Sequence, residues 1–167
     1  MKNSIHRPVL ILCLVSLLTG CLGSERFVVT EPIGPRVPTT IKISGRGYLL
    51  VYSAWDGFDA LDSDHEKHSA YAVYSEQGTL VSRVRNRTGS FEGDPTVVSL
   101  PVGTYKVEAR ATNFGLVSLR VVLRENETTV VYLDGTTKPP GAEMPNKDLI
   151  KLPNGQILGW KAQAGSR

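Results

Sequence analysis

A strict two-residue alternation of side chains over residues 105 to 112 limits the possible folds of this chain more than any other feature. Charged or polar residues alternate there with an apolar set, which consists of Tyr105, Val107, Ala109 and Ala111. Successive side chains of a β-strand point to opposite faces of a sheet, so the alternation predicts a half-buried strand. Residues 47 to 133 contain no convincing helical repeat. The chain is therefore expected to be all-β.

Six further segments have the composition of strands, because β-branched and aromatic residues occur in short runs separated by glycine, proline and asparagine. They span residues 47–53, 70–74, 80–84, 96–100, 116–123 and 129–133. The turn over residues 76–79 predicts a hairpin between the second and third of these segments. Short strands at this spacing, over about a hundred residues, predict a seven-stranded antiparallel sandwich of the immunoglobulin-like or prealbumin-like kind. A true antibody-type domain is not supported, because the chain has no Cys…Trp…Cys pattern.

Residues 136 to 167 are expected to form a linker and a small C-terminal hairpin. Asn154-Gly155 stands between two apolar stretches, and Asn-Gly is the strongest short hairpin signal because both residues tolerate positive φ. Two strands alone are marginal in water, so this hairpin must pack on the sandwich or on a partner. Ile157 and Trp160 would provide its apolar surface. The alternative is a disordered tail.

The N-terminal segment has the layout of a secretory signal over residues 1 to 20. Lys2 and Arg7 precede an apolar block over residues 9 to 18, and two small or polar residues follow that block. An apolar block of about ten residues is too short for a membrane-spanning helix, which needs roughly twenty. The segment is therefore expected to be removed.

The residues Leu18-Thr19-Gly20-Cys21 resemble a bacterial lipobox. The resemblance implies cleavage before Cys21, a diacylglyceryl thioether on its sulfur and acylation of its amine. Cys13 leaves with the signal, so the mature chain would have no free thiol, disulfide or cysteine-based metal site. Leu22 follows where enteric lipoproteins retained in the inner membrane have Asp, which implies an outer-membrane anchor facing the periplasm or the surface. The alternative is a chance cysteine at the end of an ordinary signal.

The mature composition indicates one domain and a nearly neutral surface. Without the signal, 17 basic residues stand against 16 acidic ones in 147 residues, which gives no case for a nucleic-acid partner. Residues 21–40 contain several prolines and are expected to be a lipidated N-terminus with an extended tether of about 3.1 Å per residue. A poorly ordered leader with no spacing role is the alternative. The sandwich would then occupy residues 41–135.

The block LPVGTYKVEARATNFGLVSLRVVLRENETTVVYLDG, residues 100–135, resembles the carboxypeptidase-regulatory-like (transthyretin-like, PEGA-related) β domains of bacterial surface proteins. The matching positions are Leu100, Pro101, Gly103, Tyr105, Val107, Ala109, Gly115, Thr129, Val130 and Val131. The resemblance implies a seven-stranded sandwich, usually without catalysis, that acts as a structural or adhesive accessory. Such domains often accompany a catalytic or transport domain. None is attached here, so the partner would be external.

Residues 55–68 form the only dense cluster of potential ligands. Oxygen and nitrogen donors for a divalent ion could come from Asp62, Asp64, His65 and His68. Their spacing matches neither a calcium loop nor a zinc site, so a solvated acidic loop is the better interpretation. Trp55 and Phe58 could form a sugar-stacking surface, although aromatics more often bury their area in a core.

Catalytic signatures are largely missing from the sequence. The mature chain has two histidines and no G-x-S-x-G elbow, and its paired carboxylates occur only in the acidic loop. No cofactor is indicated. We therefore expect a lipid-anchored, non-enzymatic bacterial envelope protein whose sandwich is a structural or protein-interaction module, with an envelope protein or polysaccharide as partner. The alternative is a carbohydrate- or metal-binding accessory module at the cell surface, and a hydrolase ranks lowest.

Overall fold

A computed structural model describes residues 26–35, 37–38, 43–56, 67–86, 95–141 and 147–163. These residues form strands and turns, and no helix occurs among them, which confirms the all-β class. In the same described part, no helix is long and apolar enough to cross a membrane.

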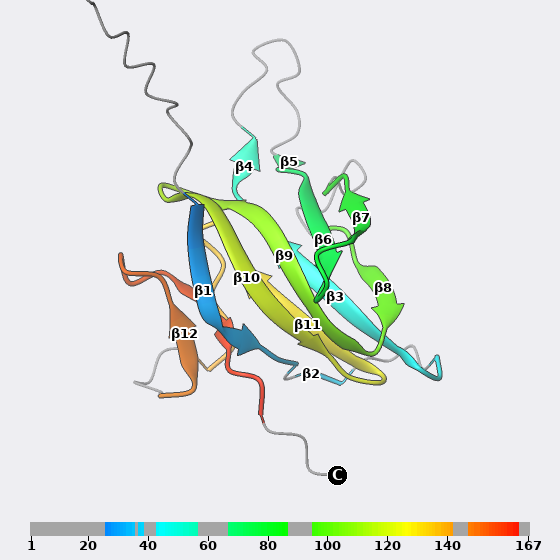
Figure 1. Ribbon diagram of the computed structural model, residues 1–167. Coiled ribbons are helices and arrows are strands. Elements are labelled where there is room, and N and C mark those ends of the chain that lie inside the picture. Colours follow the sequence, from blue (N-terminus) through cyan, green and yellow to red (C-terminus); the bar gives the residue numbers. More distant parts are fainter. Residues whose placement is uncertain are drawn as a thin grey trace, which may run out of the picture.

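Two larger sheets form the layers of a sandwich-like module. The five-stranded sheet has the order β1-β10-β9-β6-β7 and faces the viewer in Figure 1. The four-stranded sheet, β2-β11-β3-β8, lies behind it. In the first sheet the bounds are β1 Arg26–Ile33, β6 Tyr71–Ser75, β7 Leu80–Val84, β9 Gly103–Ala111 and β10 Gly115–Leu123. In the second they are β2 Val37–Pro38, β3 Arg46–Tyr52, β8 Val98–Pro101 and β11 Glu127–Tyr132.

All seven strands expected between residues 47 and 133 are present, but the module is not simply seven-stranded and antiparallel. β1 is an additional strand of the five-stranded sheet, and β2 is an additional strand of the four-stranded sheet. Two further pairs of short strands lie outside both sheets. β1 pairs parallel with β10, and β11 pairs parallel with β3. Neither parallel pair joins strands that follow one another in the chain. The hairpin patterns of the sequence, which report only local antiparallel pairs, could not reveal either pairing.

The prediction of an extended tether over residues 21–40 is wrong for β1. Val29 and Ile33 of this strand are buried in the core, opposite β10. Pro32 falls near the end of an edge strand, where a missing backbone donor is tolerated. The prolines were therefore compatible with a strand, and the module includes Arg26–Ile33, ahead of the expected boundary at residue 41.

The predicted alternation in β9 is confirmed by its burial. Val107, Ala109 and Ala111 are buried between the sheets, whereas Lys106 and Arg110 of the opposite face reach solvent. The apolar core is formed by both layers together. Its fully buried members include Leu49, Val51, Val73, Val107, Val117, Leu119, Val121 and Val131. This shared core fixes the relative positions of the two sheets.

The predicted C-terminal hairpin forms and packs on the sandwich. β12 (Leu149–Lys151) pairs antiparallel with β13 (Ile157–Trp160). The Gly34 N–H donates to the Trp160 carbonyl at 2.9 Å, which joins the hairpin to the segment after β1. A Cβ at Gly159 would lie 2.9 Å from Ile33 Cγ2 and 3.0 Å from the Val130 oxygen, so this close approach requires glycine. Leu158 is the fully buried anchor, and the expected Ile157 and Trp160 are only partly buried.

Candidate functional site

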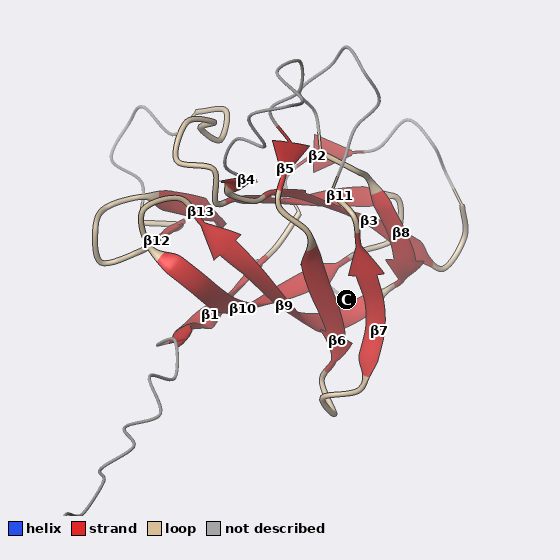
Figure 2. Ribbon diagram, turned by 90° about the horizontal axis from the view of Figure 1, so that it is seen from above, coloured by secondary structure: helices blue, strands red, loops and turns tan. Residues whose placement is uncertain are grey.

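The upper end of the sandwich in Figure 1 carries two of the residues that the sequence singled out, Trp55 and His68. β3 and β11 end there, β1 and β10 begin there, and the short strands β4 (Trp55–Asp56) and β5 (Lys67–His68) project from it. β4 and β5 pair antiparallel, with Trp55 opposite His68. We call this the β4–β5 end. Figure 2 looks down on it.

Trp55 and His68 form a stacked ring pair at the β4–β5 end. Their ring centroids are 4.1 Å apart at an interplanar angle of 21°. Tyr52 contacts the imidazole edge-on, with centroids 5.7 Å apart. His68 is only 3% exposed, whereas Trp55 is half-buried. The pair is therefore held rigidly, with the indole as the more accessible member.

A hydrogen bond fixes the orientation of the His68 ring. Nδ1 lies 2.6 Å from the Ser53 carbonyl oxygen, which can only accept, so Nδ1 carries a proton. In the neutral ring Nε2 then holds a lone pair. Nε2 is buried, and among the described residues it has no hydrogen-bond partner. An unpartnered ring nitrogen is thus buried at this end of the module.

Buried polar groups below the ring pair join the two sheets. The Asn86 amide donates to the Val51 carbonyl at 2.7 Å and to Ser53 Oγ at 2.9 Å. Ser53 Oγ donates in turn to the Ser69 carbonyl at 2.6 Å, and Asn86 Oδ1 accepts from the Thr96 N–H at 2.9 Å. The Asn86 amide thus satisfies buried backbone groups, which makes the β4–β5 end stiff.

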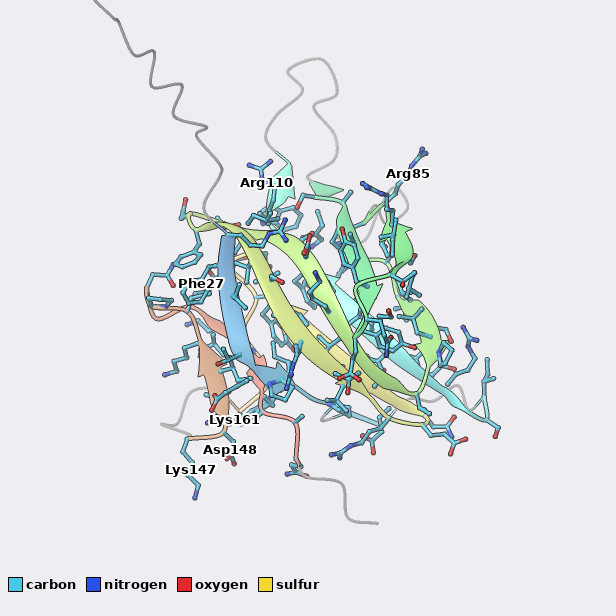
Figure 3. The ribbon with its side chains drawn as sticks, in the orientation of Figure 1. Phe27, Arg85, Arg110, Lys147, Asp148 and Lys161 are labelled. Atoms are coloured by element: carbon cyan, nitrogen blue, oxygen red, sulfur yellow. The ribbon has the colours of Figure 1, made fainter. Side chains whose placement is uncertain are left out.

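A hollow of about 380 Å³ lies beside Trp55. Its lining includes the exposed Arg110 at the end of β9 and Phe114 in the β9–β10 turn. Phe114 is supported edge-on by Phe27, with ring centroids 5.1 Å apart. Figure 3 shows Arg110 at this end of the molecule. Two aromatic side chains beside a guanidinium can hold a flat or ring-shaped group that carries negative charge.

The structure brings two of the predicted site residues together, Trp55 and His68. The other four, Phe58, Asp62, Asp64 and His65, lie outside the described residues. Within the described ranges, no three or more His, Cys, Asp or Glu side chains gather as a metal site would require. Sequence reasoning missed Arg110 and Phe114. The available signal was the aromatic Phe114 between two turn-forming residues, Asn113 and Gly115, with Arg110 a few positions before it.

Burial keeps two tyrosines of the module, Tyr71 and Tyr132, in their neutral form. Burial raises the pKa of Tyr132 to about 12, and the neighbouring Tyr52 and Asp134 contribute to the increase. Burial also raises the pKa of Tyr71. Tyr52 and Tyr132 stack with centroids 5.4 Å apart at an interplanar angle of 4°. At neutral pH these phenols therefore act as packing groups.

Comparisons with protein-family models, with curated proteins and with solved structures find no match to this chain. From its fold and site, the protein is an all-β, sandwich-like module with a stiff end that carries a ring pair and a hollow beside an arginine.

Proposed function

We propose that this protein is a lipid-anchored, non-enzymatic bacterial envelope protein whose sandwich acts as a structural or protein-interaction module. The observation that carries the proposal is the lipobox-like sequence ending at Cys21, five residues before the first strand of the module. A cysteine so placed would attach the folded part directly to a bilayer. Several acyl chains on one residue give durable anchoring, because each buried methylene contributes about 0.8 kcal/mol.

The fold supports the interaction role through its stiffness. The strands β3 and β6 to β11 would correspond to the seven strands of a prealbumin-like domain, and β1 and β2 would be additions at the sheet edges. Binding surfaces carried by a rigid scaffold lose little conformational entropy on association. We infer that the module binds an external partner, an envelope protein or a polysaccharide.

Substitution of the cysteine tests the anchor. The full chain should be expressed in a bacterial host, with Cys21→Ser as the variant and Cys13→Ser as the matched control. Wild type and the control are expected in the membrane fraction, with a mass increase from acylation. The Cys21→Ser chain should lack the mass increase, and a high-salt wash should release it from the membrane fraction, whereas the acylated chains should stay. A Cys21→Ser chain that still partitions with membranes, with unchanged mass and detergent solubility, would overturn the proposal.

Crosslinking in intact cells tests the interaction role. The anchored chain should capture one recurrent envelope component, and Cys21→Ser should capture less because the module is no longer held at the membrane. Repeated crosslinking without a recurrent product would contradict this part of the proposal.

A carbohydrate- or metal-binding role is the second candidate, and the hollow beside Trp55 favours the carbohydrate form. An indole and a phenyl ring can stack on sugar C–H edges while Arg110 binds an acidic substituent. Glycans that bind should raise the melting temperature of the wild type but not of Trp55→Ala. A ligand at 100 times its Kd adds about 2.7 kcal/mol. The same titration with Ca²⁺ or Zn²⁺ tests the metal form, and a flat response would remove it.

A further inference from the structure

The outward face of the five-stranded sheet carries an excess of positive charge. In this sheet the core-facing side chains include Val29, Val73, Val84, Val107 and Leu119, so the alternate positions face outward. The charged residues at these outward positions are Arg26, Arg83, Lys106, Glu108, Arg110 and Arg120. We call this surface the basic face. It has five cationic side chains and a single carboxylate.

Glu108 cannot balance the cations around it. The carboxylate is only 9% exposed, and its Oε1 atom accepts from Arg26 Nη1 at 2.7 Å and lies 3.0 Å from Lys106 Nζ. Two cations therefore share one oxygen. Among the described residues, the exposed Arg83, Arg110 and Arg120 have no carboxylate within ion-pair distance. The only other carboxylate of these strands, Glu31, pairs with Lys161 of the C-terminal segment at 2.9 Å.

The strand register places like charges against each other. Lys106 of β9 is the direct partner of Arg120 on β10, and like charges opposite one another destabilise a sheet. The Lys106 ammonium also lies 4.6 Å from the centre of the Tyr74 ring, on the next strand of the same face. A row of aromatic, ammonium and guanidinium groups thus crosses three adjacent strands. An external anion would reduce the repulsion between these cations.

The basic face begins at the residue closest to the proposed anchor. Arg26 is the first described residue, and Cys21 precedes it by five positions. A fully extended chain of five residues spans at most about 18 Å. Val28, two residues further along β1, points outward with 60% of its surface exposed. In Figure 1 the sheet is open toward the viewer, with β1 at its edge.

We propose that the basic face lies against the anionic phospholipid headgroups of the membrane that holds Cys21. The inference rests on the proposed lipid anchor, which would keep the face within reach of the bilayer. A broad sheet face with dispersed cations suits a surface of many phosphates better than it suits one small anion. Removal of one basic residue close to an anionic membrane weakens binding about fivefold, which corresponds to the typical electrostatic contribution of one such residue.

Vesicle binding by the full mature chain with Cys21→Ser tests the proposal without a contribution from acyl chains. The probes are vesicles of phosphatidylglycerol mixed equally with phosphatidylcholine, and vesicles of phosphatidylcholine alone. We expect binding to the anionic vesicles only, and a marked loss of binding as salt is added. Combining Arg83→Gln, Arg110→Gln and Arg120→Gln should lower the partition coefficient about a hundredfold, from about fivefold per residue.

The matched control removes the same charge elsewhere. Lys138, Lys147 and Lys151 are exposed and lie outside the five-stranded sheet, so their combined change to Gln should leave most of the binding intact. Equal losses in the two triple variants, or equal binding to both vesicle types, would overturn the proposal. So would binding to an acidic polysaccharide such as polygalacturonate without binding to vesicles. Melting temperatures verify that both triple variants are folded.

Failure of the anchor and failure of the face are distinguishable. The vesicle assay uses a chain that cannot be acylated at position 21, and the fractionation experiment above uses wild type. Acylated wild type in membranes together with no vesicle binding would refute the basic face alone. Vesicle binding by the Cys21→Ser chain, together with a wild type that carries no acyl group on Cys21, would refute the anchor alone.

Discussion

The two outward faces of the sandwich differ in the groups that they present. The face of the five-stranded sheet carries the cations described above. The outward positions of β3 and β11 include Tyr48, Tyr52 and Tyr132 and a single charged residue, Arg46, whose guanidinium donates to the Ser99 hydroxyl and carbonyl. Tyr48 and Tyr132 are buried although they point away from the core between the sheets. One face is thus largely satisfied within the chain, and the other retains unbalanced charge. This difference is the basis for the membrane contact that we propose for the five-stranded side.

The largest loss of stability is expected for a substitution in the apolar core that the two sheets share. Leu119 of β10 is buried between the sheets, and Leu119→Ala should lower the free energy of unfolding by about 2–5 kcal/mol through lost burial and a cavity. Leu80→Ala is the matched control, because Leu80 is 44% exposed, and should change stability by no more than about 0.5 kcal/mol. Urea denaturation measures both. Equal effects would contradict a core shared by the two layers.

The next largest effect concerns the contact between the layers. Asn86 follows β7 of one sheet and binds the Val51 carbonyl of the other, so Asn86→Ala should cost about 1–3 kcal/mol by leaving buried backbone groups unsatisfied. Asn86→Asp keeps the acceptor for the Thr96 N–H but loses the donor to Val51, and should remain destabilised. Asn154→Ala in the exposed C-terminal turn is the control, with a smaller expected loss. If Asn86→Asp were as stable as wild type, the amide donor would not matter.

The sequence predicted local structure well, because period-two alternation and turn residues are local signals. The seven central strands and the Asn154-Gly155 hairpin were found in this way. The parallel partners of β1 and β3 were not predictable, because they depend on packing between segments that are distant in the chain. At the site, the sequence identified Trp55 and His68. The role of Asn86 as a buried amide and the approach of Arg110 to Trp55 depend on tertiary structure.

Substitution of Glu108 should have a smaller effect, which increases vesicle binding and decreases stability. Glu108→Gln keeps the shape of the side chain but removes the one negative charge of the basic face. Anionic vesicle binding by the Cys21→Ser chain should increase about fivefold. Stability should fall by about 1 kcal/mol, because Arg26 and Lys106 are partly exposed and solvent screens much of the lost attraction.

Glu31→Gln is the control for Glu108→Gln, since it removes the same charge from the pair with Lys161. It should increase vesicle binding less than Glu108→Gln does. Equal increases would show that total charge, and not the basic face, controls binding.

The smallest effect at neutral pH should come from Tyr132, on the outward face of the four-stranded sheet, and it grows only in alkali. The pKa of Tyr132 is about 12 in the folded chain, above the value of about 10 for a free phenol. Between these values the unfolded chain has lost the proton and the folded chain still holds it, so stability falls as pH rises from about 10 to 12. Tyr132→Phe lacks this proton and should show a shallower decline, measured by urea denaturation across that range. From pH 7 to 9 the stabilities of variant and wild type should change in parallel. Declines of equal slope above pH 10 would contradict the raised pKa and, with it, the burial of this face.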